Sequence, residues 1–224
     1  MTGIKKNKRV GLRELVAAIS AGAVFCSGCS FSPPANANVF EQDIEEKINS
    51  TIRSGDYEGS ARLLRDNSYS LDDCYESSAW GTWNYFLAED LEKDGSLEEA
   101  KNYYEAAARQ LLNLRDDANC TDEWEESARI ELYYYISRSC NKIGHYRTAL
   151  NTLRELDELN DFSRDPLYNL ELGNALFGTG NLLGARVAYK EALAIAGSYG
   201  KDWVIKEARE GLTEVNRLLE ERNK

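Results

Sequence analysis

One spacing recurs along the chain and constrains how it can fold: a glycine is followed five residues later by a small residue. The four pairs are Gly55/Ser60, Gly95/Ala100, Gly144/Ala149 and Gly180/Ala185. An apolar residue follows each small residue four positions later, so the two lie on one face of a helix. The small residues are 40, 49 and 36 positions apart. A two-helix unit repeated at such an interval predicts a solenoid.

The clearest copy of this unit covers residues 172–193. Gly173 provides a position without a side chain, where a second helix can approach closely. Ala185, Tyr189 and Ala192 fall at i, i+4 and i+7 and therefore share one helix face. Small and large residues that alternate in this way form a surface suited to packing against another helix.

The pattern resembles the tetratricopeptide repeat, a helix–turn–helix unit with a period of about 34 residues. The resemblance is carried, in decreasing closeness, by residues 172–192, 87–107, 136–156 and 47–67. It covers most of the chain after about residue 40. It implies an all-α fold, an α-α superhelix (solenoid) of about four helix hairpins.

The expected hairpins pair residues 40–53 with 57–65, 77–93 with 97–114, 122–143 with 146–159, and 166–179 with 182–198. Ser96 and Glu99 are expected to form a capping box at the start of the fourth helix. A ninth helix, 201–222, carries an apolar stripe on one face and charges on the other. Such a helix is expected to cap the last repeat of a solenoid.

The N-terminal segment has a different chemistry. Five basic residues within the first thirteen precede an apolar stretch at 15–25, and small residues then precede Cys29. This order predicts a signal peptide at 1–28. The residues before Cys29 resemble a bacterial lipobox, which implies cleavage before Cys29 and a lipid on its sulfur. Residues 29–38 then form a tether, and residues 39–224 form the repeat domain. A signal peptide with an incidental cysteine is the alternative.

The charge of the chain is strongly negative. The full sequence carries −11, and removal of residues 1–28 leaves −15. Such a surface repels phosphate groups, so we expect no nucleic-acid partner. A lipid anchor would place the protein in the bacterial cell envelope, facing the periplasm from the outer or inner membrane.

An exported protein meets an oxidising compartment. Besides Cys29, the mature chain has Cys74, Cys120 and Cys140. Cys74 and Cys120 lie in connectors before successive hairpins, so a bridge between them is the preferred hypothesis, with Cys140 as a buried thiol. Three reduced cysteines are the alternative, because connectivity does not follow from sequence.

No constellation of residues points to catalysis, a cofactor or a metal. The only histidine, His145, falls in a predicted turn, and no set of partners for nucleophilic catalysis accompanies it. Phosphate-binding glycine loops and paired Cys-x-x-Cys zinc motifs are absent from the mature chain. We therefore expect that the protein is not an enzyme.

In tetratricopeptide repeats the first helix of each hairpin lines a concave groove. Carried onto this chain, the resemblance implies that the groove is lined by Tyr85, Glu89, Glu92, Lys93, Tyr134, Arg138, Asn141, Lys142, Leu170, Asn174 and Phe177. Aromatic anchors beside Arg and Asn are typical of peptide-binding surfaces. Four of these residues, Arg138, Asn141, Lys142 and Asn174, are expected to receive a carboxylate or a backbone segment. Ordinary packing of the tyrosines is the alternative.

These observations favour a lipid-anchored envelope scaffold that binds a partner protein or peptide in its groove. The alternative is an accessory protein of an envelope transporter that holds a small molecule between repeats, with Tyr85, Tyr134 and Arg138 around it.

Overall fold

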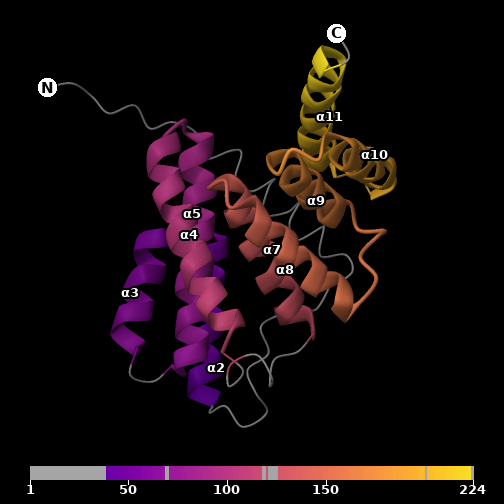
Figure 1. The fold of residues 1–224 in the computed structure, drawn as a ribbon. Coiled ribbons are helices and arrows are strands. Elements are labelled where there is room, and N and C mark those ends of the chain that lie inside the picture. The colour runs from indigo at the N-terminus through magenta and orange to yellow at the C-terminus, as the bar shows by residue number, and fades with distance from the viewer. Residues whose placement is uncertain (1–38, 69–70, 118–119, 121–125, 200, 223–224) are drawn as a thin grey trace, which may run out of the picture.

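The computed structural model describes residues 39–68, 71–117, 120, 126–199 and 201–222, and across these ranges it is helical without a β-strand (Figure 1). The predicted signal peptide, Cys29 and the tether lie outside the described residues. None of the described helices is long and apolar enough to cross a membrane. The helices are α2 (Val39–Arg53), α3 (Tyr57–Asn67), α4 (Asp73–Lys93), α5 (Leu97–Arg115), α7 (Glu126–Lys142), α8 (Tyr146–Leu159), α9 (Pro166–Gly178), α10 (Leu182–Tyr199) and α11 (Asp202–Arg222).

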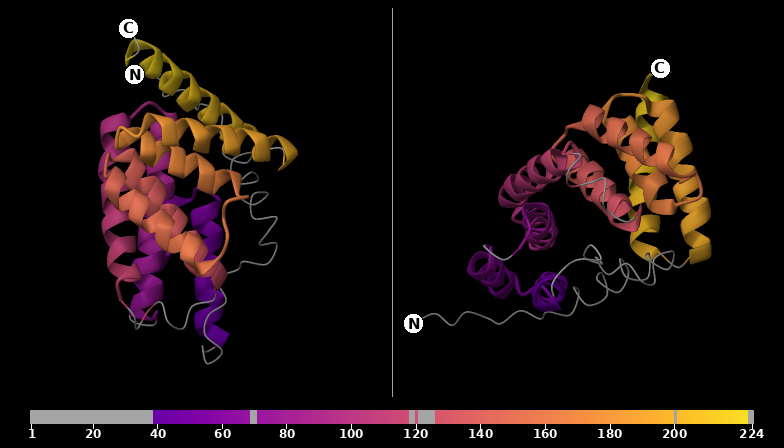
Figure 2. Two further views of the ribbon diagram at one scale, coloured as in Figure 1. Left: turned by 45° about the vertical axis from the view of Figure 1, so that its right-hand side comes forward. Right: turned by 90° about the horizontal axis from the view of Figure 1, so that it is seen from below.

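Consecutive helices pair as antiparallel hairpins: α2 with α3, α4 with α5, α7 with α8, and α9 with α10. The second helix of each hairpin also packs against the first helix of the next, and α11 packs against both α10 and α9. The hairpins follow one another around an arc (Figure 2). The predicted all-α solenoid, with four hairpins and a terminal helix over the described residues, is confirmed.

The four repeated glycines end the first helix of each hairpin. Gly55, Gly95, Gly144 and Gly180 have φ between 74° and 84°, in the left-handed region. At each, the glycine N–H donates to the carbonyl three residues back and the next N–H donates to the carbonyl five residues back, as in Gly95 to Glu92 (3.1 Å) and Ser96 to Leu91 (2.8 Å). This pair of bonds is the Schellman motif, which reverses the chain at a helix end.

Replacing Gly95 with alanine tests this turn. A Cβ at Gly95 meets nothing within 4 Å, so strain of the left-handed backbone alone should lower the free energy of unfolding, by roughly 1–2 kcal/mol. Gly197 is the matched control, because it lies inside α10 with open space around it. Gly197→Ala should leave stability unchanged or raise it slightly. Chemical denaturation measures both variants, and equal effects would contradict the turn assignment.

The small residues of the repeat lie between helices. Ser60, Ala100, Ala149 and Ala185 are all buried, and the apolar residues one turn later are buried too. In the last hairpin a Cβ on Gly173 would lie 2.6 Å from the ring of Tyr189. The close approach expected at Gly173 is therefore present, and its partner is the large side chain of the facing helix.

Two helix starts differ from expectation. Helix α4 begins at Asp73, four residues before the predicted start, because the Asp72 carboxylate accepts hydrogen bonds from the N–H groups of Cys74 (2.7 Å) and Tyr75 (2.9 Å). The capping box predicted at Ser96 is wrong, since its side chain makes no capping hydrogen bond. The predicted start of the fifth helix at 122 lies outside the described residues.

Cys74 and Cys120 form a disulfide that closes a separation of 46 residues, which restricts the unfolded chain. The bridge links the start of α4 to the connector after α5. Cys140 is a free, buried thiol whose pKa burial raises to about 11. The thiol therefore stays protonated and packs as an apolar side chain.

Candidate functional site

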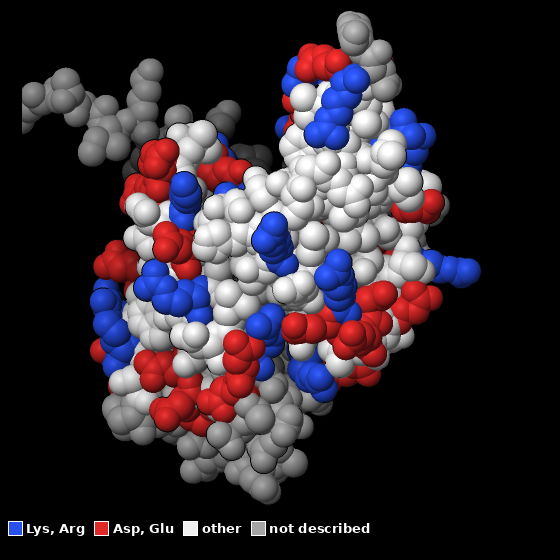
Figure 3. All heavy atoms as spheres, viewed as in Figure 1, with Lys and Arg blue, Asp and Glu red and all other residues white. Residues whose placement is uncertain are grey.

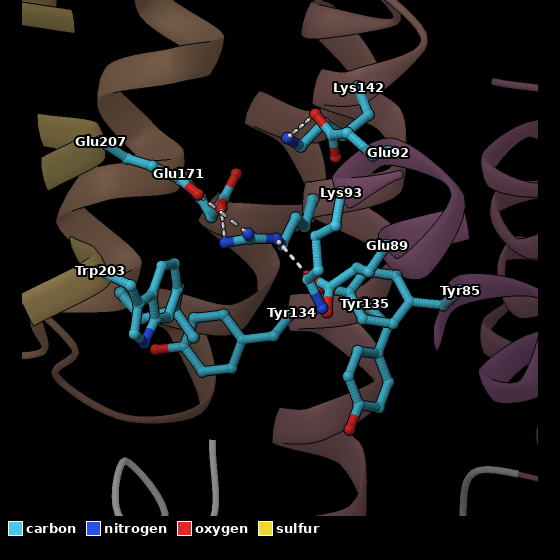
Figure 4. Close-up of a pocket in the computed structure, with 12 residues that line it drawn as sticks. Tyr85, Glu89, Glu92, Lys93, Tyr134, Tyr135, Lys142, Glu171, Trp203 and Glu207 are labelled. Atoms are coloured by element: carbon cyan, nitrogen blue, oxygen red, sulfur yellow. Dashed lines mark hydrogen bonds and ion pairs between the residues drawn. The ribbon is translucent and has the colours of Figure 1, made fainter. Parts of the chain in front are cut away.

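Helices α4, α7, α9 and α11 together enclose a cavity of about 200 Å³. Each contributes the same kind of pair, an aromatic or apolar residue followed four positions later by a charged one. The pairs are Tyr85/Glu89, Tyr134/Arg138, Leu167/Glu171 and Trp203/Glu207, and the lining is completed by Glu92, Lys93, Tyr135 and Lys142 (Figure 4). Residues four apart lie on one helix face, so each helix presents one such stripe to the cavity.

Arg138 lies at the centre of this cavity. Its guanidinium contacts three carboxylates: Nε lies 3.3 Å from Glu89, and the terminal nitrogens lie 3.2 Å from Glu171 and 3.3 Å from Glu207. The guanidinium also stacks on Trp203, 4.6 Å from the ring centre. One side chain of α7 therefore links α4, α9 and α11. Burial lowers the pKa of Arg138, but the surrounding groups raise it above its ordinary value, so Arg138 remains charged.

The α4 wall is aromatic and acidic. The Tyr85 hydroxyl donates a 2.6 Å hydrogen bond to Glu89 Oε1, and its ring lies 4.8 Å from that of Tyr135. Burial, together with the nearby carboxylate, raises the pKa of Tyr85 well above its ordinary value, so the hydroxyl keeps its proton. Glu89 Oε2 is buried and accepts no hydrogen bond.

One end of the cavity holds a second ion pair. Lys142 Nζ donates to Glu92 Oε1 at 2.7 Å, and the Tyr104 hydroxyl donates to Oε2 at 2.9 Å. Burial alone would raise the pKa of Glu92, but the bond and the charge of Lys142 outweigh it and the pKa is lowered. Lys93 lies at the rim and pairs with Asp90 at 3.2 Å.

Three of the four side chains expected to receive a partner's carboxylate, those of Arg138, Asn141 and Asn174, hold a carboxylate of the chain itself. Glu171 accepts from Arg138, from Asn141 Nδ2 (2.8 Å) and from Asn174 Nδ2 (3.4 Å). Lys142 does not take part, because it pairs with Glu92. A partner's carboxylate would therefore have to displace Glu171 from donors it already occupies.

Seven of the predicted groove residues line the cavity together: Tyr85, Glu89, Glu92, Lys93, Tyr134, Arg138 and Lys142. The four others do not. Leu170 is wrong, since it is fully buried in the core of the last hairpin. Asn141 and Asn174 hold Glu171 from behind, and Phe177 lines a separate groove between α9, α10 and α11.

Sequence reasoning missed five lining residues, namely Tyr135, Leu167, Glu171, Trp203 and Glu207. A signal for two of them was present: Trp203 and Glu207 repeat the aromatic-then-charged spacing of Tyr85 and Glu89. The apolar stripe of α11 predicts a cap alone. The helix also occupies the position that the first helix of a fifth hairpin would take.

The described surface carries charges of both signs. On the face shown in Figure 3, acidic and basic side chains surround an uncharged area. Among the described residues, no group of three or more potential ligands could hold a metal ion. His145 precedes α8 in the third turn, and its side chain makes no capping bond there.

Comparison with known proteins yields only distant similarity. No protein-family model and no curated protein matches the chain. Among solved structures, one crystal form of MamA AMB-1 is 18% identical, with 81% of this chain and 99% of that chain covered, at a TM-score of 0.44. A second crystal form is 21% identical over 79% and 98%, at a TM-score of 0.41. The fold assignment therefore rests on the helix pairs described above.

Proposed function

We propose that this chain is an interaction scaffold that binds a segment of a partner protein in the cavity between α4, α7, α9 and α11. The observation that carries the proposal is the cavity itself, which four helices from different repeats build around one buried arginine in contact with three carboxylates. Such a network holds the walls in place before a partner arrives, and preorganisation reduces the cost of binding.

The size of the cavity favours a partner side chain over a metabolite. Its volume of about 200 Å³ is below the range of roughly 300–1,000 Å³ typical of small-molecule sites. Protein interfaces, by contrast, concentrate binding energy in pockets that take one anchor residue. We therefore favour the scaffold over the transporter accessory protein as the function of this chain.

The place of action is part of the proposal. Basic residues, a short apolar stretch and a lipobox-like cysteine open the sequence, which supports export and lipidation at Cys29. Attachment through two or more acyl chains would hold the protein stably on a membrane. The repeat domain would then face the periplasm and meet other envelope proteins.

Site-specific photo-crosslinking in intact cells tests the proposal. A photoreactive residue at position 207, on the cavity wall, should capture one partner whose own sequence carries an export signal. The matched control is position 210, which is exposed on the same helix and outside the cavity lining. Equal capture from both positions would reject the binding site. A cytosolic partner captured at position 207 would reject the location.

A further inference from the structure

The charged groups of the cavity do not balance. Four carboxylates line it, Glu89, Glu92, Glu171 and Glu207, against three cations. Each cation already has a carboxylate partner: Arg138 has three, Lys142 has Glu92, and Lys93 has Asp90 outside the lining. Among the residues that the structure describes, the lining therefore carries one excess negative charge, and none of its cations lacks a partner.

A buried acceptor in the wall lacks a donor. Glu89 is only 4% exposed, and its Oε1 accepts from Tyr85 while its Oε2 accepts no hydrogen bond. A buried polar atom without a partner costs about 1–3 kcal/mol, and more when the group is charged. A guest that brings an N–H group to Glu89 would recover this cost on binding, once the side chain turns its closed-off Oε2 toward the cavity.

The remaining wall suits the stem of a basic side chain. Tyr85, Tyr134, Tyr135 and Trp203 surround the charged groups with aromatic surface (Figure 4). Aromatic faces attract cations, and the methylene stems of lysine and arginine cover apolar surface. Arg138 already uses one such face, since it stacks on Trp203.

We propose that the cavity binds a lysine or arginine side chain of the partner segment. This inference rests on the proposed function and adds the chemistry of the side chain that is bound. The guest cation is held by Glu89 and the excess negative charge, and its stem lies against the aromatic wall. A carboxylate guest is disfavoured because it would face four carboxylates and, within the described lining, no free cation. The mature chain, at −15, also attracts basic segments over a distance.

A peptide fits better than a free polyamine. The Trp203 Nε1–H group is buried without an acceptor. A peptide supplies backbone carbonyl acceptors beside its basic side chain, whereas a polyamine supplies donors alone. The volume agrees, because about 200 Å³ is room for one long side chain.

Titration of the ¹⁵N-labelled protein tests the inference. The probes are blocked tripeptides with a central lysine, norleucine or glutamate, and spermidine. The lysine peptide should shift the Trp203 indole N–H signal in a saturable manner. The norleucine peptide should bind about tenfold more weakly, because a hydrogen bond to a charged group is lost. The glutamate peptide should give no saturable shift.

Variants locate the site. Glu89→Gln should weaken lysine-peptide binding about tenfold, and Glu207→Gln should weaken it several-fold. Glu210→Gln, which makes the same change in net charge on an exposed position of α11, should leave binding unchanged. If Glu89→Gln fails to fold, as judged by thermal unfolding, the comparison of Glu207→Gln with Glu210→Gln tests the inference.

The outcomes separate the two proposals. Equal or tighter binding of the glutamate peptide overturns the inference, and so does spermidine binding that matches that of the lysine peptide. If no peptide shifts the Trp203 signal while crosslinking from position 207 still captures a partner, the inference is wrong and the scaffold stands. If both experiments fail, the cavity is not a binding site.

Discussion

Replacing Arg138 with methionine is expected to lower the free energy of unfolding by about 3–5 kcal/mol. Methionine keeps much of the length of the side chain but leaves Glu89 and Glu171 buried without their cation. Both carboxylates are almost wholly buried, so water cannot replace the lost partner. Chemical denaturation at pH 7 should show a lower midpoint with an unchanged slope.

A second substitution distinguishes lost charge from lost packing. The double variant Arg138→Met with Glu171→Gln removes one of the two stranded charges, so it should recover part of the stability that Arg138→Met loses. A double variant no more stable than Arg138→Met would indicate that packing alone was lost.

Arg217 provides the matched control on α11. Its guanidinium contacts Glu214 and Glu221, as Arg138 contacts its partners, but all three side chains are exposed. Water screens such pairs, so Arg217→Met should cause little measurable change. Equal losses for the two arginine variants would contradict the assignment of a buried charge network.

The second large effect is expected at Tyr189. Its ring is fully enclosed between α9 and α11, where a Cβ on Gly173 would lie 2.6 Å away and a Cβ on Gly211 would lie 2.4 Å away. Tyr189→Ala should lower the free energy of unfolding by about 3–5 kcal/mol, because truncation leaves a cavity between three helices. Thermal or chemical denaturation measures the loss.

Two further variants separate the parts of this contact. Tyr189→Phe removes only the hydroxyl, which donates to Asn174 Oδ1 at 2.8 Å, and should cost about 0.5–1.5 kcal/mol. Gly211→Ala should cost about 1–3 kcal/mol by overpacking against the intact ring. The double variant Tyr189→Leu with Gly211→Ala should lose less free energy of unfolding than the sum of the losses measured for Tyr189→Leu and Gly211→Ala alone. Strict additivity would show that the ring and the glycine do not meet.

The repeated architecture could be predicted because its determinants are local. A glycine at the helix end, a small residue five positions later and an apolar residue four positions after that specify a turn and a packing face within about ten residues. The same local signal is present in all four hairpins, and the structure has the turn at each. Helix existence and pairing therefore followed from the sequence.

The site could be predicted only in part, because the rotation of each helix depends on its neighbours. Successive residues of an α-helix point about 100° apart, so of two neighbouring residues one can face the core while the next faces the cavity. In α9 the close contact of Gly173 with Tyr189 fixes the rotation, which buries Leu170 and presents Glu171 to the cavity. No spacing within α9 distinguishes those two outcomes.

The sequence by itself determined the helices, their turns and the order in which the hairpins stack, since each depends on residues close together in the chain. Only the tertiary structure decided which charges meet. Arg138 reaches Glu171 across 33 residues and Glu207 across 69, through the stacking of three separate helices. The pairing of these groups depends on how the helices are rotated and spaced, and that is a property of the packed solenoid rather than of any segment within it.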